Sequence, residues 1–252
     1  MVHIVGAGCG AADLITLRGA RLLGEADVIV YAGSLVNPDL LAYAKPSCTL
    51  CDSAKMTLEE TTAVIEAAER AGKTTVRLHS GDPSLYGAIG EQMREFDRLG
   101  IEYDITPGVS AFSGAAAALK TEYTLPGVSQ SVVITRAAGR TPVPEGESLR
   151  SFAAHRATMV LFLSAGLLRS VTEDLTAGGY PADTPAAIVY KASWPDEKIF
   201  RCTLGTLEET ARENGVTKTA LIVVGGVLGE RFERSKLYDP SFSTEFREAE
   251  TK

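Results

Sequence analysis

The chain has 252 residues, of which 45% are hydrophobic and 23% charged, so it can bury one large core or two smaller ones. Its 25 Lys and Arg residues against 32 Asp and Glu give a net charge of −7, which disfavours binding to a phosphate backbone. The longest nearly uncharged apolar stretches, residues 159–168 and 220–229, are about half the ~20 residues that a membrane span requires. Residues 1–5 lack a basic leader, so we expect a cytoplasmic protein with no membrane span.

Four cysteines are too few for a disulfide scaffold, although Cys48 and Cys51 form a C-x-x-C pair. A zinc ribbon would need a second close pair, whereas Cys9 and Cys202 are isolated and the three histidines are scattered. A redox pair or half of a metal site remains an alternative. We expect ordinary buried or loop thiols and predict no metal site.

In the first half, runs rich in β-branched residues alternate with stretches whose apolar residues recur every three to four positions. This alternation predicts an α/β fold on a parallel sheet, with closing glycines at Gly24, Gly72 and Gly100. Thr57 and Glu60 form a capping box at the start of the second helix. In chain order we predict a strand at 2–5, helix 17–24, strand 28–31, helix 58–71, strand 74–79, helix 88–99, strand 103–105 and helix 111–119.

A second α/β domain is expected after a boundary near residues 120–125, where Pro126 and Gly127 interrupt the pattern. We predict an N-terminal domain over 1–120, a C-terminal domain over 121–240 and a polar tail over 241–252. Residues 137–148 form a long exposed loop by composition, and Thr206 with Glu209 predicts a second capping box. The predicted strands are 131–135, 158–163, 186–191, 198–202 and 220–225.

Three glycine-bearing loops follow strands of the first half. Residues 6–10 read Gly-Ala-Gly-Cys-Gly, residues 80–83 read Ser-Gly-Asp-Pro, and residues 107–110 read Pro-Gly-Val-Ser. All three should leave the carboxyl edge of a parallel sheet, where ligands bind. Two alternatives stay open: the first loop could be a tight turn or a dinucleotide fingerprint, and Asp82 with Pro83 could simply start a helix.

These motifs, with Asp-Leu-Ile-Thr at 13–16, resemble the tetrapyrrole (corrin/porphyrin) methylases over about residues 2–237. The resemblance implies two unequal α/β domains, with a mainly parallel sheet in the N-terminal domain and a mixed sheet in the C-terminal one. It also implies a homodimer that uses S-adenosyl-L-methionine and releases S-adenosyl-L-homocysteine. Four segments are similar to the precorrin-4 C11-methyltransferases: residues 31–36, 81–92, 135–142 and 192–196. Within the second, the sequence of residues 81–88 is more similar to the cobalt-precorrin-4 branch of these enzymes than to the other branch.

The resemblance further implies a cofactor held largely by backbone groups in a cleft between the domains. Cys9 stands where the family usually has a proline, so a fixed φ is lost at this position and a thiol is gained. The cofactor-binding residues implied by motif are Cys9, Ser80, Gly81, Asp82, Leu85, Ser110, Ala111, Leu163, Ala192 and Ala220.

The tetrapyrrole substrate carries carboxylates, which arginine forks and lysine suit, and a macrocycle on which aromatic rings can stack. Solvated surface charge and core packing are the competing interpretations for these side chains. No acid–base residue is assigned, because methyl transfer from a sulfonium needs positioning more than a strong base. The predicted substrate-binding residues are Tyr31, Ser34, Tyr86, Arg136, Arg140, Lys191 and Trp194.

The function that these features imply is methylation of carbon 11 of cobalt-precorrin-4 or precorrin-4 in corrin ring synthesis. Three other enzymes remain as alternatives: a methylase of another precorrin position, a methyltransferase acting on a protein as diphthine synthases do, and a nicotinamide-dependent oxidoreductase. A non-catalytic domain that only binds the cofactor is a further alternative.

Overall fold

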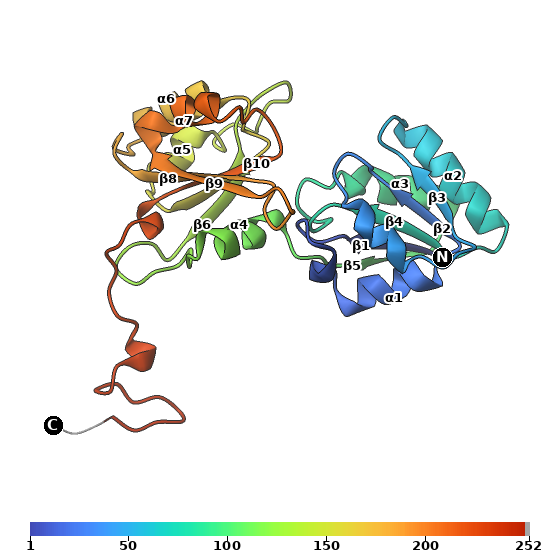
Figure 1. Cartoon of the computed structure of the whole chain (residues 1–252), viewed down its shortest axis with the longest axis horizontal. Coiled ribbons are helices and arrows are strands. Elements are labelled where there is room, and N and C mark those ends of the chain that lie inside the picture. Colours follow the sequence, from blue (N-terminus) through green and yellow to red (C-terminus); the bar gives the residue numbers. More distant parts are fainter. Residues whose placement is uncertain (250–252) are drawn as a thin grey trace. The chain divides into compact units, whose positions relative to one another are not determined.

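The computed structural model describes residues 1–249, which divide into two compact units (Figure 1). Unit 1 consists of Met1–Ala115 and Lys191–Glu197, and unit 2 consists of Ala116–Tyr190 and the residues from Lys198 onward. The chain therefore leaves unit 1, builds most of unit 2, and contributes a short segment to unit 1 before it finishes unit 2.

Unit 1 is built on a five-stranded sheet in which every neighbouring pair of strands is parallel. The strand order is β3-β2-β4-β1-β5, so β4, β1 and β5 are neighbours, and the turns that follow them leave the same edge of the sheet. The strands are β1 (Val2–Gly6), β2 (Val28–Tyr31), β3 (Thr49–Asp52), β4 (Thr75–His79) and β5 (Tyr103–Thr106).

Helices cover both faces of this sheet, which explains why nearly every residue of its central strands β1 and β4 is buried, without alternation (Figure 1). On one face Leu23 of α1 lies in a core with β-strand residues, and on the other Ile65 of α2 and Phe96 of α3 do so. The helices are α1 (Leu17–Glu25), α2 (Leu58–Arg70), α3 (Ile89–Leu99) and α4 (Ala111–Leu119), the last of which runs from unit 1 into unit 2.

Unit 2 is built on a mixed sheet of order β6-β7-β10-β8-β9, in which β6 and β7 are parallel and the other pairs antiparallel. One apolar core joins this sheet to α5, α6 and α7, with Met159, Leu175 and Leu207 fully buried in it. The elements are β6 (Val132–Arg136), α5 (Leu149–Ala153), β7 (Thr158–Phe162), α6 (Leu168–Ala177), β8 (Pro185–Tyr190), β9 (Lys198–Thr203), α7 (Leu207–Glu213) and β10 (Ala220–Val224).

The predicted fold class is confirmed, with a parallel sheet in the first half and a mixed sheet in the second. The capping box of α2 is also confirmed, because the Glu60 amide donates to the Thr57 hydroxyl and the Thr57 amide donates to the Glu60 carboxylate. Two local predictions are wrong. Gly24 lies inside α1 rather than closing it, and the Thr206 hydroxyl accepts from the Thr203 amide instead of capping α7.

The predicted polar tail is ordered by backbone contacts as far as the structure describes it. The Arg247 guanidinium donates to the carbonyl oxygens of Leu237, Asp239 and Phe242. The end of the predicted segment 241–252 lies outside the described residues. No helix within residues 1–249 is both long and apolar enough to cross a membrane.

Candidate functional site

The glycine turns that follow β1 and β4 are joined to each other by their backbones. The Gly8 amide donates to the Gly81 carbonyl over 3.2 Å, and the Gly81 amide donates back to the Gly8 carbonyl over 2.8 Å. Both residues have positive φ, +82° and +62°, which glycine adopts without steric cost. The first and second predicted loops therefore meet.

The turn that follows β5 packs onto this pair through Gly6 and Gly108. A Cβ atom built on Gly6 would lie 2.6 Å from both the Cα and the amide nitrogen of Gly108, and 2.8 Å from the Gly81 carbonyl oxygen. Real Cβ atoms essentially never approach within 3.0 Å. Backbone thus packs directly against backbone at this point, and the three loops form one cluster, which we call the glycine cluster (Gly6, Gly8, Gly81 and Gly108).

Asp82 ties the second loop to the third. Its Oδ2 accepts the Gly108 amide over 2.9 Å, and its Oδ1 accepts both the amide, over 2.9 Å, and the hydroxyl of Ser84. Burial raises the pKa of this carboxyl, but hydrogen bonds from the Ser84 hydroxyl and the two amides outweigh burial and hold the pKa below its ordinary value. The alternative that Asp82 and Pro83 start a helix is wrong, because α3 begins at Ile89.

The outer end of the first loop is held by two side chains that the sequence interpretation missed, Asn37 and Ser193. Asn37 is buried, and its side-chain amide donates to the Gly10 carbonyl over 3.0 Å. The Ser193 hydroxyl accepts the Ala11 amide over 3.0 Å and lies 3.2 Å from Cys9 Sγ. The cap pattern Asn-Pro at 37–38 predicts the short helix that Asn37 begins, but nothing in the sequence pairs either side chain with the first loop.

Several predicted cofactor residues lie around this cluster in unit 1. A Cβ on Gly114 would lie 2.7 Å from Cys9 Sγ and 3.4 Å from the Ala192 Cβ, so Cys9 and Ala192 both pack against α4. A Cβ on Gly81 would lie 3.6 Å from the Ala111 nitrogen and 3.8 Å from the Ser110 Cα. Ser80 is exposed and Leu85 half-buried beside them.

Beneath the second loop, β4 places two basic side chains in the core. Arg77 donates to the Gln92 side-chain oxygen, the Ser53 hydroxyl and the Val30 carbonyl, and burial lowers its pKa to about 10. Burial, and secondarily the charge of Arg77, lowers the pKa of His79 to about 3, so its ring is neutral at physiological pH. The His79 Nε2 is buried without a hydrogen-bond partner among the described residues.

The predicted substrate residues of unit 1 have different surroundings. Trp194 packs against Gly10, where a Cβ would collide with its indole ring. The Lys191 ammonium lies 2.6 Å from an Asp196 carboxylate oxygen and 5.5 Å from the centroid of the Trp194 ring. Tyr31 is half-buried against the α1 core, whereas Ser34 and Tyr86 are exposed.

Four predicted residues belong to unit 2. The Arg136 guanidinium donates to the carbonyl oxygens of three residues of its own loop, over 2.7 to 3.2 Å, so it also orders that loop. Leu163 follows β7 with a positive φ of 53° and is 70% exposed. Arg140 is exposed and Ala220 half-buried at the start of β10. Their ligand roles stay predictions.

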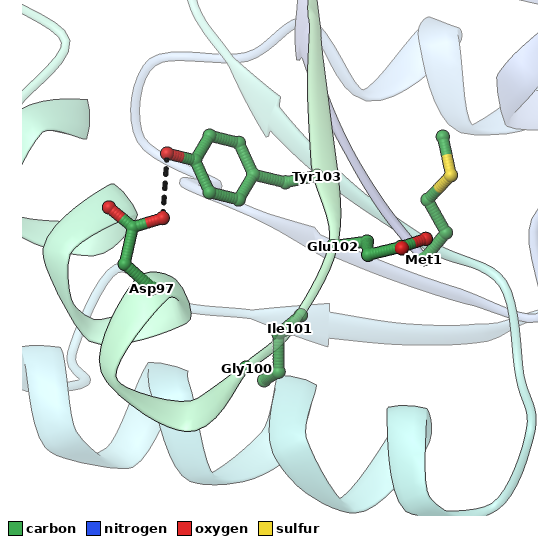
Figure 2. Close-up of a pocket in the computed structure, with 6 residues that line it drawn as sticks. All are labelled: Met1, Asp97, Gly100, Ile101, Glu102 and Tyr103. Atoms are coloured by element: carbon green, nitrogen blue, oxygen red, sulfur yellow. Dashed lines mark hydrogen bonds between the residues drawn. The ribbon is translucent and has the colours of Figure 1, made fainter.

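A shallow cavity elsewhere in unit 1 is not part of this site. Figure 2 shows its lining, in which the Tyr103 hydroxyl donates to Asp97 Oδ1 over 3.2 Å. Met1 and Tyr103 stand at the starts of β1 and β5, at the edge of the sheet opposite the glycine cluster. Within residues 1–249 no group of three His, Cys, Asp or Glu side chains is placed to hold a metal ion.

Comparison with known proteins shows the family of the chain. The family model of the Tetrapyrrole (Corrin/Porphyrin) Methylases matches residues 1–208. The chain belongs to this family. Among other tetrapyrrole methylases, the cobalt-precorrin-4 C(11)-methyltransferase of Methanocaldococcus jannaschii is 51% identical over 252 residues, which cover 100% of this chain and 97% of that relative. Further relatives, 46–49% identical, are named precorrin-4 C(11)-methyltransferase or its cobalt counterpart.

Solved structures of tetrapyrrole methylases match the fold. The X-ray structure of a cobalt precorrin-4 methyltransferase, a cobalamin biosynthetic enzyme, has a TM-score of 0.89 and 47% identity, and the match covers 91% of this chain and 96% of that one. A uroporphyrin-III C-methyl transferase from Thermus thermophilus, complexed with S-adenosyl homocysteine, has a TM-score of 0.75 and 29% identity over 90% of this chain and 98% of that one. The family and fold predicted from the sequence are therefore confirmed.

Proposed function

We propose that this tetrapyrrole methylase transfers the methyl group of S-adenosyl-L-methionine to carbon 11 of cobalt-precorrin-4. The observation that carries the proposal is the 51% identity, over the whole chain, to a cobalt-precorrin-4 C(11)-methyltransferase. Precorrin-4 without cobalt is the alternative substrate, because relatives of nearly equal identity carry that name. The enzyme would act as a homodimer, as the family resemblance implies, and we place it in the cytoplasm.

The glycine cluster and its surroundings fit a nucleoside cofactor held by backbone groups. Gly81 is the part of the cluster that remains open, since a Cβ there would meet no described atom closer than 3.6 Å. A ligand can approach the main chain closely where no side chain intervenes. We assign cofactor contacts in unit 1 to Cys9, Ser80, Gly81, Asp82, Leu85, Ser110, Ala111 and Ala192, and in unit 2 to Leu163 and Ala220.

The chemistry demands positioning rather than an acid–base relay. When bound, S-adenosyl-L-methionine would supply an electrophilic methyl group: its sulfur–methyl bond would break as the bond to carbon 11 formed, and S-adenosyl-L-homocysteine would be left. Holding the two reacting atoms in line can lower the barrier by roughly 7–11 kcal/mol. A rigid cluster of backbone, fixed by Asp82 and by the Gly8–Gly81 hydrogen bonds, can provide this alignment.

Substrate recognition would come from basic and aromatic side chains of both units. The carboxylates of the tetrapyrrole suit the guanidinium groups of Arg136 and Arg140 and the ammonium of Lys191. The rings of Tyr31, Tyr86 and Trp194 offer apolar faces to the macrocycle, and Ser34 offers a hydroxyl. The net charge of −7 would oppose a polyanionic substrate over the whole surface, so recognition depends on these local groups.

The product identifies the reaction directly. The purified enzyme would be incubated with isotopically labelled S-adenosyl-L-methionine and either cobalt-precorrin-4 or precorrin-4, and the product analysed by mass spectrometry with fragmentation. We expect one labelled methyl group at carbon 11. A methyl group at another carbon, or transfer only to a protein such as translation elongation factor, would overturn the proposal.

A pair of glycine variants tests the cofactor site. Gly81→Ala and Gly72→Ala both place a side chain at a φ near +65°, and neither Cβ would overlap a neighbouring atom. Both should lose about 1 kcal/mol of stability from backbone strain. Only Gly81→Ala should weaken S-adenosylhomocysteine binding in calorimetry, because Gly72 lies at the end of α2. Equal affinity of both variants and the native protein would place the cofactor elsewhere.

A further inference from the structure

The segment Lys191–Glu197 connects β8 to β9 but is grouped with unit 1. Its shape is set by hydrogen bonds within the segment. The Trp194 amide donates to the Lys191 carbonyl and the Glu197 amide to the Trp194 carbonyl, each over 3.0 Å, while the Ser193 amide donates to the Glu197 carboxylate over 2.6 Å. Lys191 and Ser193 have positive φ values of 48° and 64°. The turn is thus held in its conformation by three hydrogen bonds among its own residues.

This turn presents Ser193 to the first glycine loop. The Ser193 hydroxyl accepts the Ala11 amide over 3.0 Å and hydrogen-bonds Cys9 Sγ over 3.2 Å. A Cβ on Gly10 would lie 2.8 Å from that same hydroxyl and 2.6 Å from the Ala192 carbonyl oxygen. Three successive residues of the loop are therefore in contact with the turn, and Ser193 contacts each of them.

We propose that Ser193 is a positioning residue of the cofactor site, whose hydroxyl fixes the Cys9–Ala11 end of the first glycine loop in its ligand-binding conformation. This inference rests on the proposed function, because it assumes that the loop holds S-adenosyl-L-methionine. Cys9 does not restrict its own φ, so the hydrogen bonds to Ser193 supply a restriction at this end of the loop.

The same turn contains a spectroscopic reporter. Trp194 is the single tryptophan of the chain, and its ring packs against Gly10 of the loop that Ser193 holds. A ligand that fills the loop changes the surroundings of this ring, and no other tryptophan contributes to the emission. Fluorescence titration with S-adenosylhomocysteine therefore observes this loop alone.

The test compares three variants of the full chain. Ser193→Ala removes the hydroxyl and keeps the Cβ, while Ser193→Gly removes the hydroxyl and also relieves the positive φ. Ser148→Ala is the matched control, because the Ser148 hydroxyl accepts a backbone amide over 3.1 Å at the start of α5 in unit 2. Circular dichroism and thermal unfolding would establish that each variant is folded.

We expect both Ser193 variants to bind S-adenosylhomocysteine about three- to tenfold more weakly than the native protein, because they lose the hydroxyl's hydrogen bonds to the Ala11 amide and Cys9 Sγ. The KM for S-adenosyl-L-methionine should rise by the same factor, while kcat and the KM for the tetrapyrrole stay within twofold, roughly, of the native values. Ser148→Ala should lose stability with unchanged affinity and KM. A merely structural role of Ser193 would not weaken cofactor binding while leaving kcat and the KM for the tetrapyrrole unchanged.

Three outcomes overturn the inference. The first is native affinity for S-adenosylhomocysteine in both Ser193 variants. The second is a loss confined to Ser193→Ala, which would mean that backbone strain rather than the hydroxyl matters. The third is Trp194 emission that does not change while calorimetry shows the native protein saturated. Failure of the native protein to bind S-adenosylhomocysteine at all would instead refute the cofactor assignment, so the two failures are distinguishable.

Discussion

Substitution of Gly6 by alanine examines the packing on which the whole site depends. The new Cβ would lie 2.6 Å from two backbone atoms of Gly108 and 2.8 Å from the Gly81 carbonyl oxygen, all inside the 3.0 Å limit. These neighbours are main-chain atoms, so no side chain can rotate away to make room. The turns after β4 and β5 must therefore move apart by several tenths of an ångström.

The expected cost follows from that geometry. Overpacking a tight site costs typically about 1–3 kcal/mol, and backbone neighbours place Gly6→Ala near the upper end, about 3 kcal/mol. For a protein of this size each kcal/mol lowers the melting temperature by roughly 2–4 °C, so the loss should be about 6–12 °C. Scanning calorimetry would measure the melting temperature, and titration calorimetry the affinity for S-adenosylhomocysteine, which should fall because the displaced turns carry the proposed ligand contacts.

Gly90→Ala is the matched control for this experiment. Gly90 lies in the first turn of α3, and a Cβ there would meet no atom within 4 Å. Since alanine is the better helix former, this variant should be more stable by up to about 1 kcal/mol, with unchanged affinity. If Gly6→Ala melted and bound ligand like the native protein, the three turns could not be in backbone contact, and the reasoning about the glycine cluster would be refuted.

Three further predictions concern side chains around the cluster. Burial lowers the pKa of His79 from 6.5 to about 3. Between these two pH values the unfolded chain binds a proton that the folded chain does not bind, so the free energy of unfolding falls as the pH drops from 6.5 towards 3. His79→Leu should flatten the dependence of the unfolding free energy on pH between 7 and 4. Asp82→Asn should cost about 1–3 kcal/mol at pH 7 in urea unfolding, because a charge-assisted hydrogen bond is lost. Since the folded pKa of Asp82 lies below 3.8, the difference from the native protein should persist at pH 5 and shrink only in stronger acid; a constant difference down to pH 2 would contradict the assignment. Gly114→Ala should cost about 1–3 kcal/mol by overlap with Cys9 Sγ, and Cys9→Ala in the same chain should restore part of it, which a double-mutant cycle measures.

The sequence predicts most of the sheet and helix pattern, because nearly every central strand is an apolar run and most helices have clear apolar periodicity. It misses β3 (Thr49–Asp52), an edge strand whose residues are mostly exposed and therefore carry no apolar signal. Gly24 is misleading because a glycine within the last turn of a helix and a glycine just after it look alike in sequence. Thr206 is misleading because its hydroxyl accepts a hydrogen bond from the amide of Thr203, three residues earlier, instead of capping the helix that follows.

The sequence predicts those parts of the candidate site that consist of local motifs. The three glycine turns were expected at one sheet edge, and the structure brings Gly6, Gly8, Gly81 and Gly108 into direct contact. The side chains that hold the first loop could not be predicted, because their partners are set by the tertiary fold. Ser193 stands between two predicted site residues, Ala192 and Trp194, but its contact with Cys9 spans 184 residues of sequence.

The long separation between Cys9 and Ser193 has a consequence for synthesis on the ribosome. Domains generally fold from the N-terminus as the chain emerges, so the parallel sheet can assemble early. Its first turn, however, acquires its hydrogen-bond acceptor only when residue 193 leaves the exit tunnel. A fragment truncated at residue 120 would contain all five strands of that sheet and still lack part of its own ligand loop, and adding residues 191–197 as a free peptide should complete it.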